Sequence, residues 1–220
     1  MRHIDIETWP RREHFEFFRN WEYPHFNMCA NLDLTAFYPF VKQRGISFTV
    51  AIMYILARGA NAIPEFRYRI RDGEVIEHEI VHPSVTILTD DDLFTFCPVK
   101  YTDDFSLFAA RGTEQIRYMK ENPTLEKELP ELDTLLFMTA IPWVSFTSFM
   151  HPLNFPVDSV PRFAWGKFFE EGESLKMPLN VQAHHAVMDG IHMGRYYEEV
   201  QEYLQKPEVV LGEVSGRRSV

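Results

Sequence analysis

The segment 48–62 is apolar on nearly every side of the helix that its spacing predicts. Ser47 stands at the expected N-cap, where its hydroxyl can accept a hydrogen bond from a first-turn amide. The segment ends before Pro64, a residue that cannot continue a helix. A helix without a polar face is buried rather than laid on a surface. The fold therefore has to be built around this helix.

Other predicted helices and strands interleave irregularly along the chain. Asp72-Gly73 is the strongest hairpin signal, because this pair tolerates the positive φ angles of a two-residue turn. We predict helices at 11–20, 35–44 (with Thr35 as N-cap), 105–121 and 191–204, and strands at 3–6, 25–34, 67–70, 75–81, 85–88, 93–99, 135–139, 144–149, 162–169 and 175–183. This order predicts one α/β domain, residues 1–211, in which helices cover a mixed sheet. Residues 212–220 are expected to form a disordered tail.

The composition limits the possible functions. With 220 residues and 45% hydrophobic content, the chain can bury its own core without disulfides or a structural metal. Its formal net charge of −10 argues against a general binder of nucleic acid or anionic membranes, whose surface is usually basic. A polyanionic CoA thioester needs only a few well-placed cations and is compatible with this charge. We find no signal peptide and no run of about 18 apolar residues, so we expect a cytoplasmic protein.

The stretch 182–190 carries the most informative chemistry. A predicted strand ends in His184 and His185, and Gly190 stands just before a predicted helix, where an unusual backbone conformation is expected. Transfer of an acyl group to an alcohol needs a base that removes the hydroxyl proton during attack, and neutral imidazole suits this role at cellular pH. The reaction also needs a hydrogen-bond donor for the oxygen anion that forms, but no metal.

Two other interpretations of these residues are open at this point. Two histidines before Asp189 and Gly190 could mark only a strand end, a helix cap and a turn. The same side chains could also be metal ligands. Adjacent residues of a strand point to opposite faces, however, so His184 and His185 would not easily chelate one ion. We therefore expect no metal site.

Four motifs, in order along nearly the whole chain, resemble the chloramphenicol acetyltransferase family (type A, with an HHxxxDG signature). They lie at 9–17 (WPRREHFEF), at 64–67 (PEFR) with 72–74 (DGE), at 142–149 (PWVSFTSF), and at 177–195, which contains HHAVMDG. The resemblance implies the CoA-dependent acyltransferase fold of that family, an α/β two-layer sandwich with a mixed β-sheet covered by helices. It also implies acetyl-CoA as co-substrate.

The resemblance implies roles for three residues around this signature. His185 matches the general base, whose tautomer is held in the family by its own backbone carbonyl. Asp189 matches an aspartate that pairs with an arginine, here Arg11, and the pair is expected to brace the turn that presents the histidine. Removing one partner would leave a charge unpaired in a partly buried site, which is costly.

Other matched positions include two departures from the family pattern. Thr139 stands where the family has an oxyanion-stabilising serine; its hydroxyl can still donate, but its methyl restricts the rotamer. Ala164 stands where the family has a threonine that holds a water near the transition state, and its side chain cannot form a hydrogen bond. Lys167 matches a lysine near the phosphate end of CoA. Four aromatic positions match contacts to the acceptor, with ordinary core packing as the alternative: Phe18, Phe26, Phe94 and Phe149.

The resemblance implies a chloramphenicol O-acetyltransferase that confers antibiotic resistance by acetylating the primary hydroxyl of the drug. It implies a homotrimer with active sites between subunits, and we expect neither a nucleic-acid nor a membrane partner. One alternative keeps the chemistry and changes the acceptor to another alcohol or an amine, which the departures at Thr139 and Ala164 could reflect. A second alternative is a non-catalytic trimeric protein that sequesters a ligand; the presence of His185, Asp189 and Arg11 counts against it.

Overall fold

The computed structural model describes residues 1–125, 132–153 and 158–212. The predicted tail therefore lies outside the described residues except for Gly212. Within these ranges, none of the helices is both long enough and apolar enough to cross a membrane.

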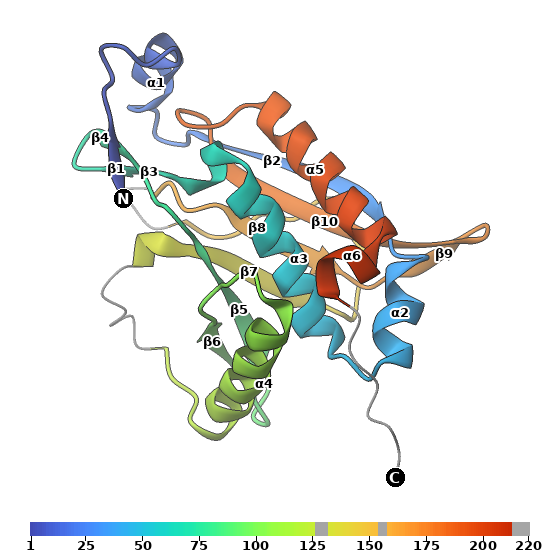
Figure 1. Cartoon of the computed structure of the whole chain (residues 1–220). Coiled ribbons are helices and arrows are strands. Elements are labelled where there is room, and N and C mark those ends of the chain that lie inside the picture. Colours follow the sequence, from blue (N-terminus) through green and yellow to red (C-terminus); the bar gives the residue numbers. More distant parts are fainter. Residues whose placement is uncertain (126–131, 154–157, 213–220) are drawn as a thin grey trace.

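A large mixed sheet forms one layer of the molecule (Figure 1). Its strand order is β2-β10-β8-β7-β5-β6, and β9 pairs with β10. Strand β7 runs parallel to both of its neighbours, β5 and β8, whereas the other pairs are antiparallel. This arrangement confirms the predicted α/β class with a mixed sheet. The strands are β2 (His25–Asp33), β5 (His82–Leu88), β6 (Phe94–Pro98), β7 (Leu135–Ile141), β8 (Arg162–Gly166), β9 (Phe169–Glu171) and β10 (Ser174–His184).

A smaller antiparallel sheet has the order β1-β4-β3, with β1 at Arg2–Ile4, β3 at Tyr68–Arg71 and β4 at Glu74–Glu77. The predicted hairpin between β3 and β4 is confirmed. Asp72 and Gly73 form its turn with φ angles of 51° and 81°, the left-handed conformation that a two-residue hairpin loop of this kind requires.

The second layer consists of helices on one face of the large sheet. Helix α3 (Phe48–Ala62) lies beside α5 (Gly190–Gln205) across that face (Figure 1). Ten of its residues, from Val50 to Ala60, are buried, and the Ser47 hydroxyl accepts a hydrogen bond from the Val50 amide, as predicted. The other helices are α1 (Arg12–Phe18), α2 (Phe37–Gln43), α4 (Phe105–Glu121), α6 (Pro207–Leu211) and two short 3-10 helices, η1 (Pro64–Arg67) and η2 (Leu132–Thr134).

Two predicted elements are wrong. Thr35 does not cap α2, which begins two residues later without a side-chain cap. The Thr35 hydroxyl instead accepts a hydrogen bond from the amide of Leu175, a residue of β10 that pairs with β9. Residues 144–149 form no strand; a single hydrogen bond from the Lys167 amide to the Val144 carbonyl replaces a ladder.

The two faces of the large sheet differ in chemistry, and β10 illustrates the difference. Leu179, Val181 and Ala183 point toward the helices and belong to the main hydrophobic core. The residues between them are polar, yet Asn180, Gln182 and His184 are also buried, at 0–3% exposure. The segment 142–151 lies over the part of this face that β8 and β10 form: the His151 amide donates to the Gln182 side chain at 2.9 Å, and a side chain at Gly166 would meet the Val144 carbonyl and the Phe146 ring.

Candidate active site

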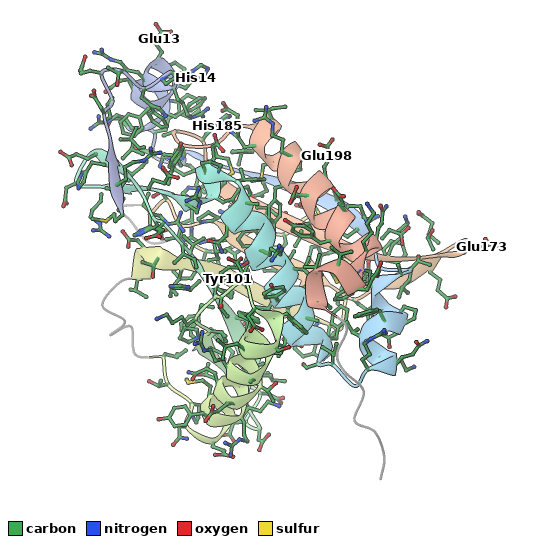
Figure 2. The ribbon with its side chains drawn as sticks, in the orientation of Figure 1. Glu13, His14, Tyr101, Glu173, His185 and Glu198 are labelled. Carbon is green, nitrogen blue, oxygen red and sulfur yellow. The ribbon has the colours of Figure 1, made fainter. Side chains whose placement is uncertain are left out.

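His185 follows the last residue of β10 and precedes α5. Figure 2 shows it in the connection between these elements, at the end of the molecule that carries α1. Its amide donates to the Pro24 carbonyl at 2.8 Å, which fixes the backbone where β10 ends. The imidazole is 33% exposed and is therefore accessible to a substrate.

The surroundings of the His185 ring select one tautomer. Its Nδ1 lies 3.1 Å from the Met188 carbonyl oxygen and 3.1 Å from Asp189 Oδ1. A carbonyl and an ionised carboxylate only accept hydrogen bonds, so Nδ1 must carry the proton. Nε2 then has the free electron pair that a general base needs.

The resemblance implied that the carbonyl of His185 itself would hold this tautomer, and in this structure that prediction is wrong. The His185 carbonyl accepts a hydrogen bond from Arg11 Nη2 at 2.6 Å. Nδ1 of the ring instead faces the Met188 carbonyl and the Asp189 carboxylate.

Arg11 joins three parts of the turn that follows β10. It forms a two-point ion pair with Asp189, with Nη2 2.7 Å from Oδ1 and Nη1 in contact with Oδ2. Its Nε donates to the Ala186 carbonyl at 3.0 Å. Hydrogen bonding to Arg11 is the main cause that lowers the pKa of the Asp189 carboxyl, which is therefore ionised beside the histidine.

Packing of α1 places Arg11 at the turn. Phe15 of α1, Tyr68 and Val75 of the small sheet, and Ala186 and Val187 form a second hydrophobic cluster. The cluster is separate from the main core, so α1 and the small sheet together serve as a support for the turn.

Two residues behind Asp189 were missed by the sequence analysis. The Asp189 amide donates to His192 Nδ1 at 2.9 Å, and His192 Nε2 lies 3.4 Å from Glu65 Oε1. The Asp189 side chain in turn caps the first turn of α5. The signal was present, since His192 follows Asp189 by three residues, the spacing of a capping box.

Two of the predicted aromatic residues enclose the imidazole. The Phe18 ring stacks on His185 with 4.2 Å between ring centroids and 6° between planes. The Phe26 ring lies 4.6 Å away at 37°. The stacked Phe18 ring covers one face of the imidazole and the tilted Phe26 ring contacts it, while a third of the side chain stays exposed.

The comparisons with known proteins agree with this geometry. The family model described as chloramphenicol acetyltransferase matches residues 1–201. The chain belongs to the chloramphenicol acetyltransferase family. A chloramphenicol acetyltransferase of Escherichia coli is 38% identical over 204 residues, which cover 91% of this chain and 92% of that protein.

Solved structures confirm the predicted acyltransferase fold. A chloramphenicol acetyltransferase structure superposes with a TM-score of 0.81 at 28% identity, covering 93% of this chain and 100% of the other. The structure of Azotobacter vinelandii dihydrolipoamide acetyltransferase gives a TM-score of 0.66 at 18% identity, covering 90% and 88% of the two chains. The second similarity concerns the fold alone.

Four residues matched to the chloramphenicol acetyltransferase family are not brought to His185 within this chain. Thr139 on β7 pairs with Ala164 on β8, and Ala164 pairs with Asn180 on β10. Asn180 precedes His185 by five residues, which is about 16 Å along an extended strand. The other three lie elsewhere: Phe94 is on the edge strand β6, Phe149 packs against Phe146 and His151, and Lys167 is exposed after β8.

Buried histidines beside the site are held neutral. Burial, with a smaller effect of the neighbouring His25, lowers the pKa of His184 to about 3. Burial and the charge of Arg162 lower the pKa of His25 to about 4. Among the described residues, no group of three or more His, Cys, Asp or Glu side chains is arranged to hold a metal ion.

Proposed function

We propose that this chain is an acetyl-CoA-dependent O-acetyltransferase that acts on the primary hydroxyl of chloramphenicol. Family membership supports the reaction class and the acceptor. The observation that carries the mechanism is the His185 ring, whose Nδ1 faces two acceptors while Nε2 keeps its electron pair. A protein that only sequestered a ligand would have no need for a base selected in this way.

In the proposed reaction, His185 Nε2 removes the proton of the acceptor hydroxyl as the hydroxyl oxygen attacks the thioester carbonyl. The carbonyl oxygen becomes an anion. When the carbon–sulfur bond breaks, the CoA sulfur leaves and takes the proton from the imidazolium, which restores the base. The Asp189 carboxylate, 3.1 Å from Nδ1, stabilises the imidazolium between the two proton transfers.

We further propose that the site is completed by a second copy of the chain within a homotrimer. The separation of Thr139 from His185 in one chain supports this assembly, because the oxygen anion needs a donor close to the base. Thr139, Phe94 and Phe149 of one copy would then face His185, Phe18 and Phe26 of another, with Lys167 toward the CoA. Such a trimer acting in the cytoplasm would inactivate the drug before it reaches the ribosome.

A thiol-release assay tests the proposal. Purified protein is incubated with acetyl-CoA, with and without chloramphenicol, beside His185→Ala as the matched control. We expect CoA release only when both the drug and His185 are present, and a trimer by light scattering for both proteins. Drug-dependent release from His185→Ala at a rate near that of the wild type would contradict the assigned base.

A second acceptor is favoured by two departures from the pattern that the resemblance implies: Ala164 stands in place of a threonine and cannot form a side-chain hydrogen bond, and Thr139 stands in place of a serine and is bulkier. If the protein binds acetyl-CoA but releases no free CoA when chloramphenicol is added, the same assay is repeated with other alcohols and amines. Release with one of them keeps the chemistry and replaces chloramphenicol as the acceptor.

A further inference from the structure

One peptide group, between Met188 and Asp189, connects two histidine rings. Its carbonyl oxygen lies 3.1 Å from His185 Nδ1. Its amide nitrogen donates to His192 Nδ1 at 2.9 Å. A peptide group is planar, and in the trans form its carbonyl and its N–H point in opposite directions. The two rings therefore bind the two ends of one rigid unit.

This connection requires opposite tautomers of the two rings. The carbonyl only accepts hydrogen bonds, so His185 Nδ1 carries a hydrogen. The amide only donates, so His192 Nδ1 has no hydrogen, and in the neutral ring Nε2 carries it. A hydrogen on His192 Nδ1 would place two donors against each other. The peptide group is thus held from its amide side only by the Nε2–H form of His192.

Glu65 favours this form of His192. Its Oε1 lies 3.4 Å from His192 Nε2, and the two side chains are mostly buried, with 13% of His192 and 21% of Glu65 exposed. A negative charge beside Nε2 attracts the ring hydrogen to that nitrogen and leaves Nδ1 as an acceptor. Burial lowers the pKa of His192, and a smaller effect of Glu65 opposes it, so the ring is neutral at cellular pH.

The main core fixes the position of Glu65. Glu65 belongs to η1, and its neighbour Phe66 is fully buried. The Phe66 ring stacks on Tyr196 of α5, with 4.5 Å between ring centroids and 29° between planes. Both rings belong to the main hydrophobic core, whereas α1, which supports Arg11, packs in the second cluster. The turn after His185 is therefore held from two independent parts of the molecule.

We propose that His192 is a positioning residue for acetyl transfer: it holds the peptide group whose carbonyl selects the tautomer of His185, and Glu65 keeps His192 in the form that can do so. The inference rests on the proposed function. Without an acceptor for its amide, the planar group can rotate, and its carbonyl then turns away from His185 Nδ1. His185 would spend part of its time with the hydrogen on Nε2, where it cannot accept a proton.

The first test compares His192→Leu with His192→Asn. Leucine has no acceptor, whereas the asparagine side-chain oxygen can take the place of Nδ1. We expect His192→Leu to lower kcat about 10-fold with KM for both substrates within about twofold, because the base is impaired but binding is not. The loss is limited because the Asp189 carboxylate still faces Nδ1. His192→Asn should keep kcat within about threefold of the wild type. Equal losses in the two variants would overturn the inference.

The second test is a double-mutant cycle between Glu65 and His192. Glu65→Leu should lower kcat about fivefold in the wild type and leave it unchanged in His192→Asn, since asparagine has no ring hydrogen to redistribute. Glu202→Leu, which removes an exposed partner of Lys206 from α5, is the control and should not change kcat. Circular dichroism verifies that each variant is folded. An equal effect of Glu65→Leu in both backgrounds would overturn the inference, even if His192→Leu does not fold.

Histidine tautomers can be measured without turnover. Proton–nitrogen correlation NMR of protein with isotopically labelled histidine distinguishes Nδ1–H from Nε2–H, and variants that lack one histidine assign its signals. We expect Nδ1–H at His185 and Nε2–H at His192 in the wild type, and a mixture at His185 in His192→Leu. A wild-type His192 with Nδ1–H, or an unchanged His185 in His192→Leu, would contradict the inference.

Failure of the proposed function gives a different result. If the wild-type protein releases no CoA with chloramphenicol or with other acceptors, the proposed function fails. The NMR spectra then decide by themselves whether His192 sets the tautomer of His185.

Discussion

The two faces of the large sheet are built from the same strands but carry different side chains, apolar on one face and polar on the other. Toward the helices, Leu179, Val181 and Phe163 are fully buried in one apolar core. Toward the segment 142–151, Asn180 and Gln182 are equally buried, although they are polar. Alternation along a strand makes this possible, because successive side chains point to opposite faces.

The two faces should respond differently to substitution. The helix-covered face gains free energy from every apolar atom that it removes from water. The other face carries buried polar groups that reduce stability unless they are hydrogen-bonded. Truncation of an apolar side chain on the first face should therefore destabilise the fold, and replacement of an unpaired polar side chain on the second face should not.

The largest effect is expected at the site itself. His185→Ala removes the base and should lower kcat at least 10³-fold, while Tm changes by only a few degrees, because the ring is one-third exposed. Stopped-flow or endpoint thiol release measures the first quantity, and differential scanning fluorimetry the second. A variant that retains a tenth of wild-type kcat would refute the role of His185.

The next effect lies on the helix-covered face. Leu179→Ala should reduce the free energy of unfolding by about 2–5 kcal/mol, because it leaves a cavity in a core that is closed on all sides. Urea denaturation followed by circular dichroism measures this change. Asn180→Leu, one residue away on the other face, is the control and should not destabilise the protein. Equal losses from both variants would remove the distinction between the faces.

The third prediction concerns acid. The pKa values of His184 (about 3) and His25 (about 4) are well below the ordinary 6.5, so below pH 6.5 the unfolded chain binds protons that the folded chain does not. Stability is then complete above pH 6.5 and is lost as the pH falls toward 4. For these two rings the loss at pH 5.5 is about 2–3 kcal/mol. Urea midpoints that stay constant from pH 7.5 to 5.5 at fixed salt would contradict this expectation.

A smaller effect is expected at the support of the site. Asp189→Ala leaves Arg11 unpaired where it is only 11% exposed, and should lower Tm together with kcat; we expect about 1–3 kcal/mol of destabilisation. Glu7→Ala breaks the exposed ion pair with Arg12 and serves as the control, with almost no effect. Thermal melts of both variants provide the comparison. An unchanged Tm for Asp189→Ala would argue against a bracing role.

The smallest effect is expected at Thr139. Thr139→Ser keeps the hydroxyl and removes a methyl group, so kcat should change by less than about threefold. Thr139→Val keeps the shape and removes the hydroxyl, and should lose at least 10-fold. If both variants behave alike in thiol release, the hydroxyl is not the donor.

The sequence was sufficient to predict helices and turns that depend on residues close together in the chain. Helix α4 begins and ends at the predicted residues, and Asp72-Gly73 forms the predicted turn. The strand predicted at 144–149 was wrong, because β-branched and aromatic residues favour a strand but do not show that the segment has a neighbour to pair with. Likewise Thr35 is a good cap by type, but its hydroxyl is used by a distant amide.

The candidate site was predictable to the extent that its residues are neighbours in one turn. The motif and the Arg11 position led directly to a connected group around His185. The acceptors that bind Nδ1 depend on the conformation of the turn and could not be derived from residue type. The placement of Thr139 and Phe94 depends on sheet order and, in our proposal, on a second copy, neither of which one sequence specifies.

The enclosure of α3 has a consequence for how the molecule can be monitored. Its residues from Val50 to Ala60 are covered by sheet and helices, so a partial opening of the edge strands or of α1 leaves them in place. Their amide hydrogens should exchange with deuterium only when the whole chain unfolds. The exchange rates of these amides therefore measure the free energy of global unfolding. Faster exchange of the amides in the turn after His185 would then measure local opening of the site.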